Sequence, residues 1–496
     1  MYVFLSLIST AICVYIIWFV EKQRRIRRIL SKFPTPPMKF FYGNAEDFIS
    51  KEGMLRAFND YTKKYGDIVY TRIGPLYHGL LFTDADLAKE VFQANINLTK
   101  GSAYEFCRSW LGHGLLTTDE KRWKKQRKIV TPAFNTQLLI EFIPVFDKQS
   151  NILIEKLDNA PSKDSLNIHR FIGLCSLDIT CETSMGVKLG AQNEQNTEYV
   201  IAVKEMCRII ATRSYSMLKA MKLTYPFTED YSIEKKSVKI LHGFTDRVVQ
   251  KKREQRKEQT ESNLDQDGRS RRSNLLDILL DYSDKEKLLS EKEIRDEIHT
   301  FMFAGHDTVT AAMSFFVYEI AKNKDLQDLL YQEQQNVFGS NMDRDLDQSA
   351  INDLKLLDSV IKETMRLYPP VPVYTRLVTK EFVFDGKLIP EGITIIHFAY
   401  GTHRNPKYYD NPDTFDPYRF EDPKNLTIGS YLPFSTGPRN CIGQKFANNE
   451  MKVILSKLIR TFEFRPAEPE HELDLRAEVV LTSKNGINVK IIRRQQ

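Results

Sequence analysis

An uncharged apolar run opens the chain, from Val3 to Val20, and only Ser6, Ser9 and Thr10 interrupt it with mildly polar side chains. A helix of this length spans roughly 27 Å, which is enough for a thin bilayer such as that of the endoplasmic reticulum. The run has no polar face, so an amphipathic helix buried in a soluble protein is disfavoured. Residues 1–20 are therefore predicted to form a transmembrane signal-anchor.

Charged residues begin immediately after this run. They form a mainly basic cluster of Glu21, Lys22, Arg24, Arg25, Arg27 and Arg28. Positive flanks stay on the cytosolic side of a membrane, so we expect the body of the protein in the cytosol and the short N-terminus in the lumen. A cleaved signal peptide is the competing interpretation, but no basic residue precedes the run and no small-residue cleavage site follows it.

The segment Pro34-Thr35-Pro36-Pro37 predicts a stiff hinge, because proline lacks the amide donor that a helix needs and biases the preceding residue toward extended geometry. Residues 21–37 are accordingly interpreted as a basic stop-transfer segment and hinge. The remaining chain, residues 38–496, shows no sign of a second core, and we expect it to form one domain.

Within that domain, helical and strand patterns are unevenly distributed. Short β-rich pieces at 68–73 and 79–82 flank a Gly-Pro turn and predict a small sheet. Long helical patterns dominate from there to about residue 370, and the chain then becomes irregular, with a strand-like run at 393–398. The charged stretch 251–272 predicts a solvated helix end and a mobile loop. The expected fold class is mostly α with a smaller β-rich region.

Composition excludes several classes of protein. The net charge of +6 is modest for 496 residues, so no nucleic-acid partner is expected. The six cysteines form no C-x-x-C pair and no regular framework, which argues against zinc sites and a disulfide scaffold. The folded domain is therefore expected to face a reducing compartment.

One cysteine stands in a distinctive loop, Phe434-Ser435-Thr436-Gly437-Pro438-Arg439-Asn440-Cys441-Ile442-Gly443. Gly437 and Gly443 would let the backbone pass close to a flat ring, since a side chain at either position would clash with the ring or require an unfavourable φ. Cys441 would supply an axial sulfur ligand to haem iron, and a thiolate in this position favours O–O bond cleavage. A buried free cysteine in a glycine turn is the alternative.

The Phe-x-x-Gly-x-Arg-x-Cys-x-Gly spacing of this loop resembles that of the cytochrome P450 monooxygenases, and the resemblance extends from about Phe33 to the C-terminus. It implies the P450 fold with one N-terminal membrane anchor helix, and residues 38–496 as the catalytic domain. It also implies haem b as cofactor, with Cys441 as the metal ligand and Phe434, Gly443 and Arg439 among the cofactor-binding residues.

A second motif lies in a helical pattern from Ile294 to Ile320, whose centre reads Ala304-Gly305-His306-Asp307-Thr308. It resembles the family's oxygen-binding helix. The small pair would leave room for dioxygen, while Thr308 could hydrogen-bond a reacting oxygen or water and Asp307 could relay protons. We therefore expect Asp307 and Thr308 to be catalytic. In the alternative, Thr308 only hydrogen-bonds back to its own helix.

The run from Glu297 to Thr308 also resembles family 4 of the cytochromes P450, especially its insect-like microsomal members. Many of these enzymes hydroxylate fatty acids near the chain terminus. Many carry Glu at the position of Ala304, where the carboxyl forms an ester to a haem methyl group. Alanine cannot form that bond, so we expect haem without a covalent link at Ala304.

Two further motifs follow the family's order. Glu363 and Arg366 lie three residues apart on one helical face, and with Arg419 they resemble a buried structural network. Trp123 and Arg127 lie four residues apart, and the resemblance implies that they contact a haem propionate, with Arg439 as a further candidate. Plausible pocket residues, for which core packing is the alternative, are Phe106, Trp110, Phe301 and Val373.

The resemblance implies a haem-thiolate monooxygenase that takes electrons from NADPH through a P450 reductase, with cytochrome b5 as an optional second partner. Its expected location is the endoplasmic reticulum membrane, and its expected substrate is a small apolar molecule such as a fatty acid, a lipid hormone or a xenobiotic. Two alternatives stay open. One is a haem-thiolate isomerase or dehydratase, and the other is a non-enzymatic haem sensor or electron carrier.

Overall fold

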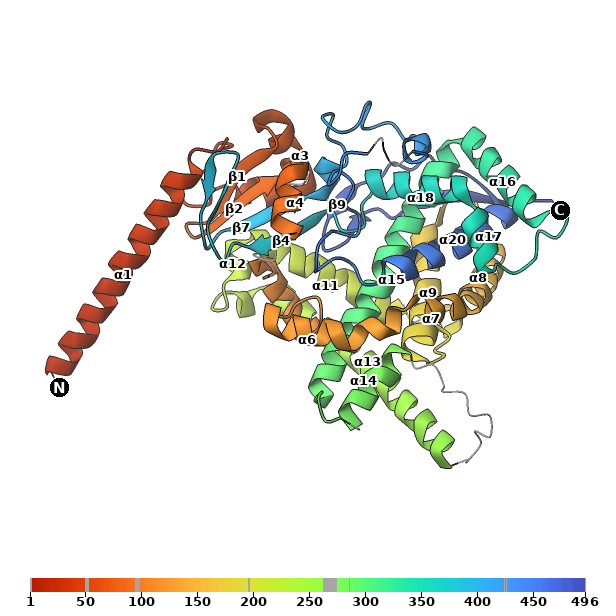
Figure 1. Ribbon diagram of the computed structural model, residues 1–496, viewed down its shortest axis with the longest axis horizontal. Coiled ribbons are helices and arrows are strands. Elements are labelled where there is room, and N and C mark those ends of the chain that lie inside the picture. Colours follow the sequence, from red (N-terminus) through yellow and green to blue (C-terminus); the bar gives the residue numbers. More distant parts are fainter. Residues whose placement is uncertain are drawn as a thin grey trace.

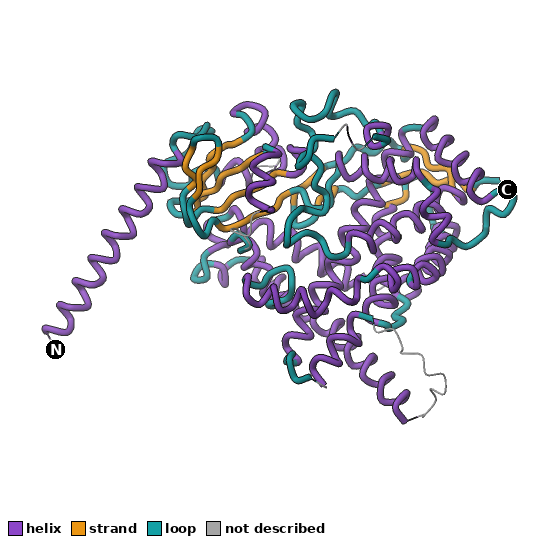
Figure 2. The backbone as a smooth tube through the Cα atoms, in the orientation of Figure 1, coloured by secondary structure: helices purple, strands orange, loops and turns teal. Residues whose placement is uncertain are grey.

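The computed structural model describes residues 2–49, 53–93, 99–194, 197–261, 274–284, 286–422, 424 and 426–495. A helical body carries strands toward two of its ends, and one long helix, α1, projects away from it (Figures 1 and 2). The predicted fold class, mostly α with a smaller β-rich region and one membrane-anchor helix, is confirmed. Of the charged stretch 251–272, residues 262–272, where the mobile loop is predicted, lie outside the described residues.

The helices run as follows: α1 Tyr2–Leu30, α2 Ala45–Ile49, α3 Gly53–Tyr65, α4 Ala85–Gln93, η1 Ser102–Cys107, α5 Arg108–Leu111, α6 Glu120–Val130, η2 Thr131–Phe134, α7 Thr136–Glu141, α8 Ile143–Asp158, α9 Ile168–Thr180, η3 Cys181–Met185, α10 Ala191–Glu194, α11 Thr197–Tyr215, α12 Met217–Ala220, η4 Tyr225–Phe227, α13 Glu229–Glu261, α14 Leu275–Asp284, α15 Glu291–Lys322, α16 Lys324–Phe338, α17 Gln348–Asp353, α18 Lys355–Leu367, α19 Ala399–Thr402, η5 Pro417–Phe420 and α20 Gln444–Thr461.

The strands are β1 Ile68–Ile73, β2 Tyr77–Phe82, β3 Leu166–Asn167, β4 Val373–Leu377, β5 Phe382–Phe384, β6 Lys387–Ile389, β7 Thr394–Phe398, β8 Phe462–Pro466, β9 Leu475–Ala477, β10 Leu481–Ser483 and β11 Asn488–Arg493. The largest sheet has the order β1-β2-β7-β4, in which β2 and β7 are parallel and the other pairs antiparallel. The smaller sheets have the orders β3-β11-β8, β10-β9 and β5-β6.

Helix α1 is apolar and long enough to cross a membrane from Phe4 to Leu30, and its apolar window is not buried in the body. The expected boundary at residue 20 is not marked by a break, because the helix continues through the basic cluster to Leu30. The helix continues because its C-terminal end packs against the body. Ile26 and Leu30 are buried in a second hydrophobic core beneath the large sheet, and Arg25 pairs with Glu381 at 2.8 Å.

Helix α15 crosses the middle of the body (Figure 1) and is buried along most of its length. Its start is fixed by a capping box: the Ser290 hydroxyl accepts from the Glu293 amide at 3.3 Å, and the Glu293 carboxylate accepts from the Ser290 amide at 2.9 Å. It packs closely on α9, where a Cβ on Gly305 would lie 3.0 Å from a methyl carbon of Thr180. Gly305 therefore permits close contact between the two helices, and it also lines the cavity described below together with Ala304, so the predicted room for dioxygen stays a prediction.

Candidate active site

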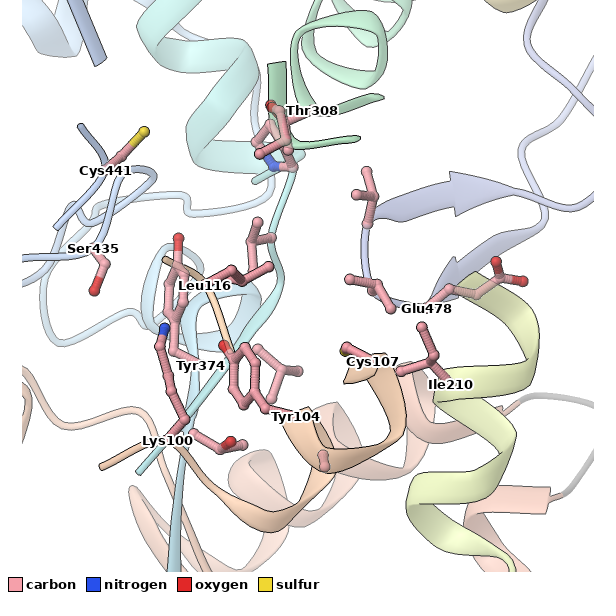
Figure 3. A pocket seen from close by; sticks show the side chains of 18 of the residues that line it. Lys100, Tyr104, Cys107, Leu116, Ile210, Thr308, Tyr374, Ser435, Cys441 and Glu478 are labelled. Atoms are coloured by element: carbon pink, nitrogen blue, oxygen red, sulfur yellow. The ribbon is translucent and has the colours of Figure 1, made fainter. Parts of the chain in front are cut away.

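A cavity of about 440 Å³ lies between α15, the loop that carries Cys441, the β4 strand and the turn after β9. Its walls are mainly apolar and aromatic. Figure 3 shows Cys441 on one side of this cavity, Thr308 projecting from α15, and Glu478 on the opposite side. Of the four pocket residues expected from the sequence, Phe106, Phe301 and Val373 line the cavity. Trp110 does not line it, because Trp110 is buried in the core, where its ring centroid lies 4.8 Å from that of Phe303.

The Cys441 side chain is accessible and faces the cavity. Its loop is held by a hydrogen bond from the Cys441 amide to the Phe434 carbonyl at 3.0 Å. Burial raises the pKa of the Cys441 thiol, while the Gly443 amide and the nearby Arg127 guanidinium act in the opposite direction. Two donors of positive character therefore already face the sulfur, which suits a thiolate ligand.

The two glycines of this loop are needed for different reasons. Gly437 has a φ of +75°, and a Cβ there would lie 1.8 Å from the carbonyl oxygen of Phe92, so no side chain fits. The close neighbour of Gly437 is thus the α4 backbone, and its positive φ is the unusual backbone angle that was expected from the sequence as one of two reasons for a glycine. Gly443 differs: a Cβ there would lie 3.9 Å from the Cys441 sulfur, at the start of α20.

Arg439 reaches across the loop to Trp123, with its guanidinium carbon 4.9 Å from the indole ring. One guanidinium nitrogen donates to the Thr118 carbonyl at 2.9 Å. The other two nitrogens are buried and have no hydrogen-bond partner among the described residues. Burial, reinforced by Arg376, lowers the pKa of Arg439 to about 10. A buried cation with free donors requires an anionic partner.

Arg439 belongs to a cationic cluster that also contains Lys100 and Arg376. The sequence did not predict a role for Lys100 or Arg376. Burial and both arginines hold the pKa of Lys100 well below its usual range. In Figure 3 its amine points toward the Cys441 side of the cavity. A backbone bridge pairs Lys100 with Arg376 of β4. No local motif marks these residues, because three distant segments meet here.

Arg127 also lines the cavity, but its guanidinium, unlike that of Arg439, is hydrogen-bonded to the Cys441 loop. It donates to the Asn440 carbonyl at 3.0 Å and to the Asn440 side-chain oxygen at 3.1 Å. The structure thus brings Trp123, Arg127 and Arg439 to one side of the cavity, with Arg127 fastened to the residue before Cys441.

Thr308 faces the cavity, and its hydroxyl donates to the Ala304 carbonyl at 2.9 Å. A hydroxyl that donates in this way keeps lone pairs that accept a hydrogen bond from the cavity. Asp307 is not among the cavity-lining residues. Its pKa is raised by burial, and the neighbouring His306 opposes that shift. The two expected catalytic residues are therefore adjacent, but only Thr308 reaches the cavity.

The expected Glu363, Arg366 and Arg419 are brought together in the interior. Arg366 donates two hydrogen bonds of 2.7 Å to the Glu363 carboxylate and others to backbone carbonyls of the following irregular segment. The Arg419 guanidinium lies 3.6 Å from the same carboxylate. The network fastens α18 to the segment that leads into the Cys441 loop.

The segment before α6 is fastened to α15 by two acidic side chains. Asp296 accepts from the His113 amide at 2.8 Å, and Glu297 accepts from the Leu115 amide at 3.1 Å. Leu115 and the next residue line the cavity. Glu297 is fully buried, and burial raises the pKa of its carboxyl to about 8.

These features fit haem. Cys441 offers a sulfur ligand to iron, the apolar cavity suits a porphyrin face, and the unpartnered donors of Arg439 suit its carboxylates. Arginine geometry matches a carboxylate in two parallel hydrogen bonds. The fold and this donor set define a haem-thiolate protein.

Comparison with known proteins agrees. A cytochrome P450 family profile matches residues 33–491, and the chain belongs to the cytochrome P450 family. The chain is 34% identical to cytochrome P450 4c21 of Blattella germanica over 99% of both chains. It is 35% identical to cytochrome P450 4d2 of Drosophila melanogaster over 97% of both, and 36% identical to human cytochrome P450 4V2 over 88% of this chain and 84% of that one. The expected resemblance to family 4 is confirmed, and with it a haem-thiolate monooxygenase activity.

Proposed function

We propose that this enzyme inserts one oxygen atom from dioxygen into a fatty acid, a lipid hormone or a foreign compound. Electrons come from NADPH through a P450 reductase, with cytochrome b5 as an optional second donor. The observation that carries the proposal is that Cys441, Thr308 and Arg439 meet around one mainly apolar cavity. Apolar walls favour substrates that partition out of a membrane.

Within the proposal, haem supplies a redox-active iron, and a thiolate ligand favours O–O bond cleavage. Cys441 provides the thiolate. Arg439 would hold a haem carboxylate with its two unpartnered nitrogens, and Trp123 packs on the Arg439 guanidinium. Arg127 orients the loop through Asn440. Ala304 has no carboxyl group, so haem is held without a covalent link.

Phe434 and Gly443 line the cavity next to Cys441 and would allow the loop to lie against haem. Thr308 holds a proton or a water molecule at its hydroxyl oxygen, next to the reacting atoms. Asp307, the residue before Thr308 in α15, has a pKa raised by burial and would carry protons toward Thr308. The network of Glu363, Arg366 and Arg419 keeps the Cys441 loop in place and takes no part in the chemistry.

We further propose that the enzyme is bound to the endoplasmic reticulum membrane. Residues 1–20 act as the anchor, residues 21–37 as the stop-transfer segment that joins the anchor to the body, and residues 38–496 as a catalytic domain in the cytosol. The uncharged run in α1 and the basic residues that follow it support this arrangement.

The test is incubation of the purified holoenzyme with reductase, NADPH and a library of lipids and xenobiotics under isotopically labelled dioxygen. Products should gain one labelled oxygen atom, as detected by mass spectrometry. Product formation without dioxygen or NADPH would instead indicate an isomerase or a dehydratase.

A further inference from the structure

Glu478 is the only acidic side chain among the described residues that line the cavity. It lies in the turn between β9 and β10, next to Val479 and Val480, which also line the cavity. In Figure 3 it lies across the cavity from Cys441, on the same side as Ile210 of α11. A carboxyl group in this apolar wall has no part in the proposed haem contacts.

No hydrogen bond or ion pair joins Glu478 to any other residue in the described part of the chain. Burial raises the pKa of its carboxyl to about 7. The charged groups around it act at longer range: Lys204, Glu205 and Arg208 come from α11, and Asp307 comes from α15. A half-buried carboxyl that faces a cavity without a protein partner is available to a ligand.

The positive charges of the cavity lie elsewhere. Lys100, Arg127 and Arg439 belong to the side of the cavity next to the Cys441 loop, where Arg127 is bound to Asn440 and the other two suit the haem carboxylates. The lining residues beside Glu478, namely Ile210, Val479 and Val480, are apolar. A free carboxylate brought to this side would meet a second carboxyl group and no cation of the cavity lining, because Lys204 and Arg208 act on Glu478 from outside that lining.

We infer that Glu478 selects an apolar substrate whose polar end is a hydroxyl group, and disfavours a free fatty acid of the same chain length. The substrate hydroxyl donates a hydrogen bond to the Glu478 carboxylate, which is acceptor-only when ionised. This inference rests on the proposed function and narrows its range of substrates.

The position of Glu478 also sets where oxidation falls. Because Glu478 and Cys441 lie across the cavity from each other, a chain held at its hydroxyl end extends its apolar end toward Cys441 and Thr308 (Figure 3). A C–H bond far from the substrate hydroxyl then becomes C–OH. The second atom of dioxygen leaves as water, with two electrons from NADPH and two protons from solvent. The product is a diol.

In the experiment, the holoenzyme is titrated at pH 8 with 1-dodecanol, dodecanoate and methyl dodecanoate. Binding of each compound is measured from the shift that it induces in the haem spin state. The wild type should bind the alcohol at least about tenfold more tightly than the carboxylate, a difference of about 1.4 kcal/mol. Glu478→Gln keeps the size of the side chain and removes the charge. It should reduce the preference to less than about threefold, mainly through tighter binding of dodecanoate.

The matched control is Glu391→Gln, which makes the same chemical change at an exposed turn outside the cavity lining and should keep the wild-type preference. A wild type that prefers dodecanoate, or a Glu478→Gln variant with unchanged preference, would overturn the inference. The wild-type comparison does not depend on the folding of any variant. If none of the three ligands shifts the spectrum, the preference is measured by competition between 1-dodecanol and dodecanoate in NADPH-dependent turnover. Preferential oxidation of dodecanoate would then overturn the inference. Absence of oxygenated product from any compound in the library would contradict the proposed function itself, whatever the role of Glu478.

Discussion

Glu363 and Arg366 are joined by two parallel hydrogen bonds of 2.7 Å, and neither side chain is exposed to solvent. The remaining donors of Arg366 are used by the carbonyls of His403, Pro412 and Thr414. One guanidinium group therefore closes a junction between α18 and the irregular segment that leads to the Cys441 loop. Lysine has neither the planar shape nor the number of donors to replace it.

Arg366→Lys should therefore destabilise the protein. Breaking a buried ion pair leaves an incompletely paired charge, and the free energy of unfolding should fall by about 3–5 kcal/mol. Thermal denaturation and the ratio of haem to protein measure the effect. As a control, Lys324→Ala removes an exposed pair with Asp328 and should cost less than about 1 kcal/mol. Native stability and full haem content in Arg366→Lys would contradict the structural role of the network.

Cys441→His should abolish the red-shifted carbon monoxide spectrum of the reduced protein, because that spectrum requires a thiolate ligand. The cavity offers a matched control in Cys107, a second thiol in its lining, whose pKa is raised to about 12 by burial. Cys107→Ser should keep the red-shifted spectrum. If Cys441→His kept it as well, another residue would be the ligand.

Thr308→Ala should uncouple NADPH oxidation from product formation and release peroxide, since the hydroxyl that faces the cavity is lost. Coupling is measured as the ratio of product formed to NADPH consumed, together with the amount of peroxide released. Thr310 is a close control: its hydroxyl also donates back along α15, to the His306 carbonyl at 2.6 Å, but it does not line the cavity. Thr310→Ala should stay coupled. Tight coupling in Thr308→Ala would remove the proposed role.

Haem should leave the polypeptide completely on extraction into acidified organic solvent, because the methyl side chain of Ala304 cannot form an ester. Absorbance of the organic and aqueous phases measures the partition. Ala304→Glu places a carboxyl group at the cavity wall and should leave part of the haem with the protein. Retention of haem by the wild type would show a covalent link at some other residue.

Glu297 should make stability depend on pH. Its pKa is about 8 in the folded protein against an ordinary value of 4.5, so the native state keeps a proton that the unfolded state has released. Its contribution to the free energy of unfolding therefore decreases as pH rises from about 4.5 to 8. Glu297→Gln should match the wild type near pH 5 and exceed its melting temperature near pH 8.5.

Glu293 gives a control of opposite sign for that experiment. The pKa of its carboxyl is lowered: burial alone would raise it, but hydrogen bonds from Ser290 outweigh that effect. Its stabilising contribution is thus present at neutral pH and is lost as pH falls through the folded pKa. Glu293→Gln should be less stable than the wild type near pH 8 and converge with it in acid. If Glu297→Gln followed the same course, the buried Glu297 would not be protonated at neutral pH.

Local patterns predicted those parts of the molecule that depend on neighbours in the chain. The strand at 68–73 has the predicted bounds, and the periodic segment from Ile294 to Ile320 is contained in α15. The pair of Glu363 and Arg366 could be predicted because three residues separate them on one helical face. In each case the sequence spacing itself carries the geometry.

Features that depend on distant segments could not be predicted in this way. Lys100 and Arg376 come from parts of the chain far from Arg439, and nothing near either of them in sequence indicates an anion site. The neighbour of Gly437 is the Phe92 carbonyl, which only the folded chain brings within contact. Glu478 was not singled out either, because a lone glutamate between hydrophobic residues resembles an ordinary strand-end residue.

Helix α1 enters the body without a break, and its root is held by Ile26, Leu30 and the pair of Arg25 with Glu381. The junction between α1 and the body is therefore rigid. The tilt of α1 in a lipid bilayer then determines the orientation of the whole body relative to the membrane surface. Membrane thickness thereby becomes a variable that reorients the enzyme, and substituting a longer or shorter anchor would turn the catalytic body as well as move it.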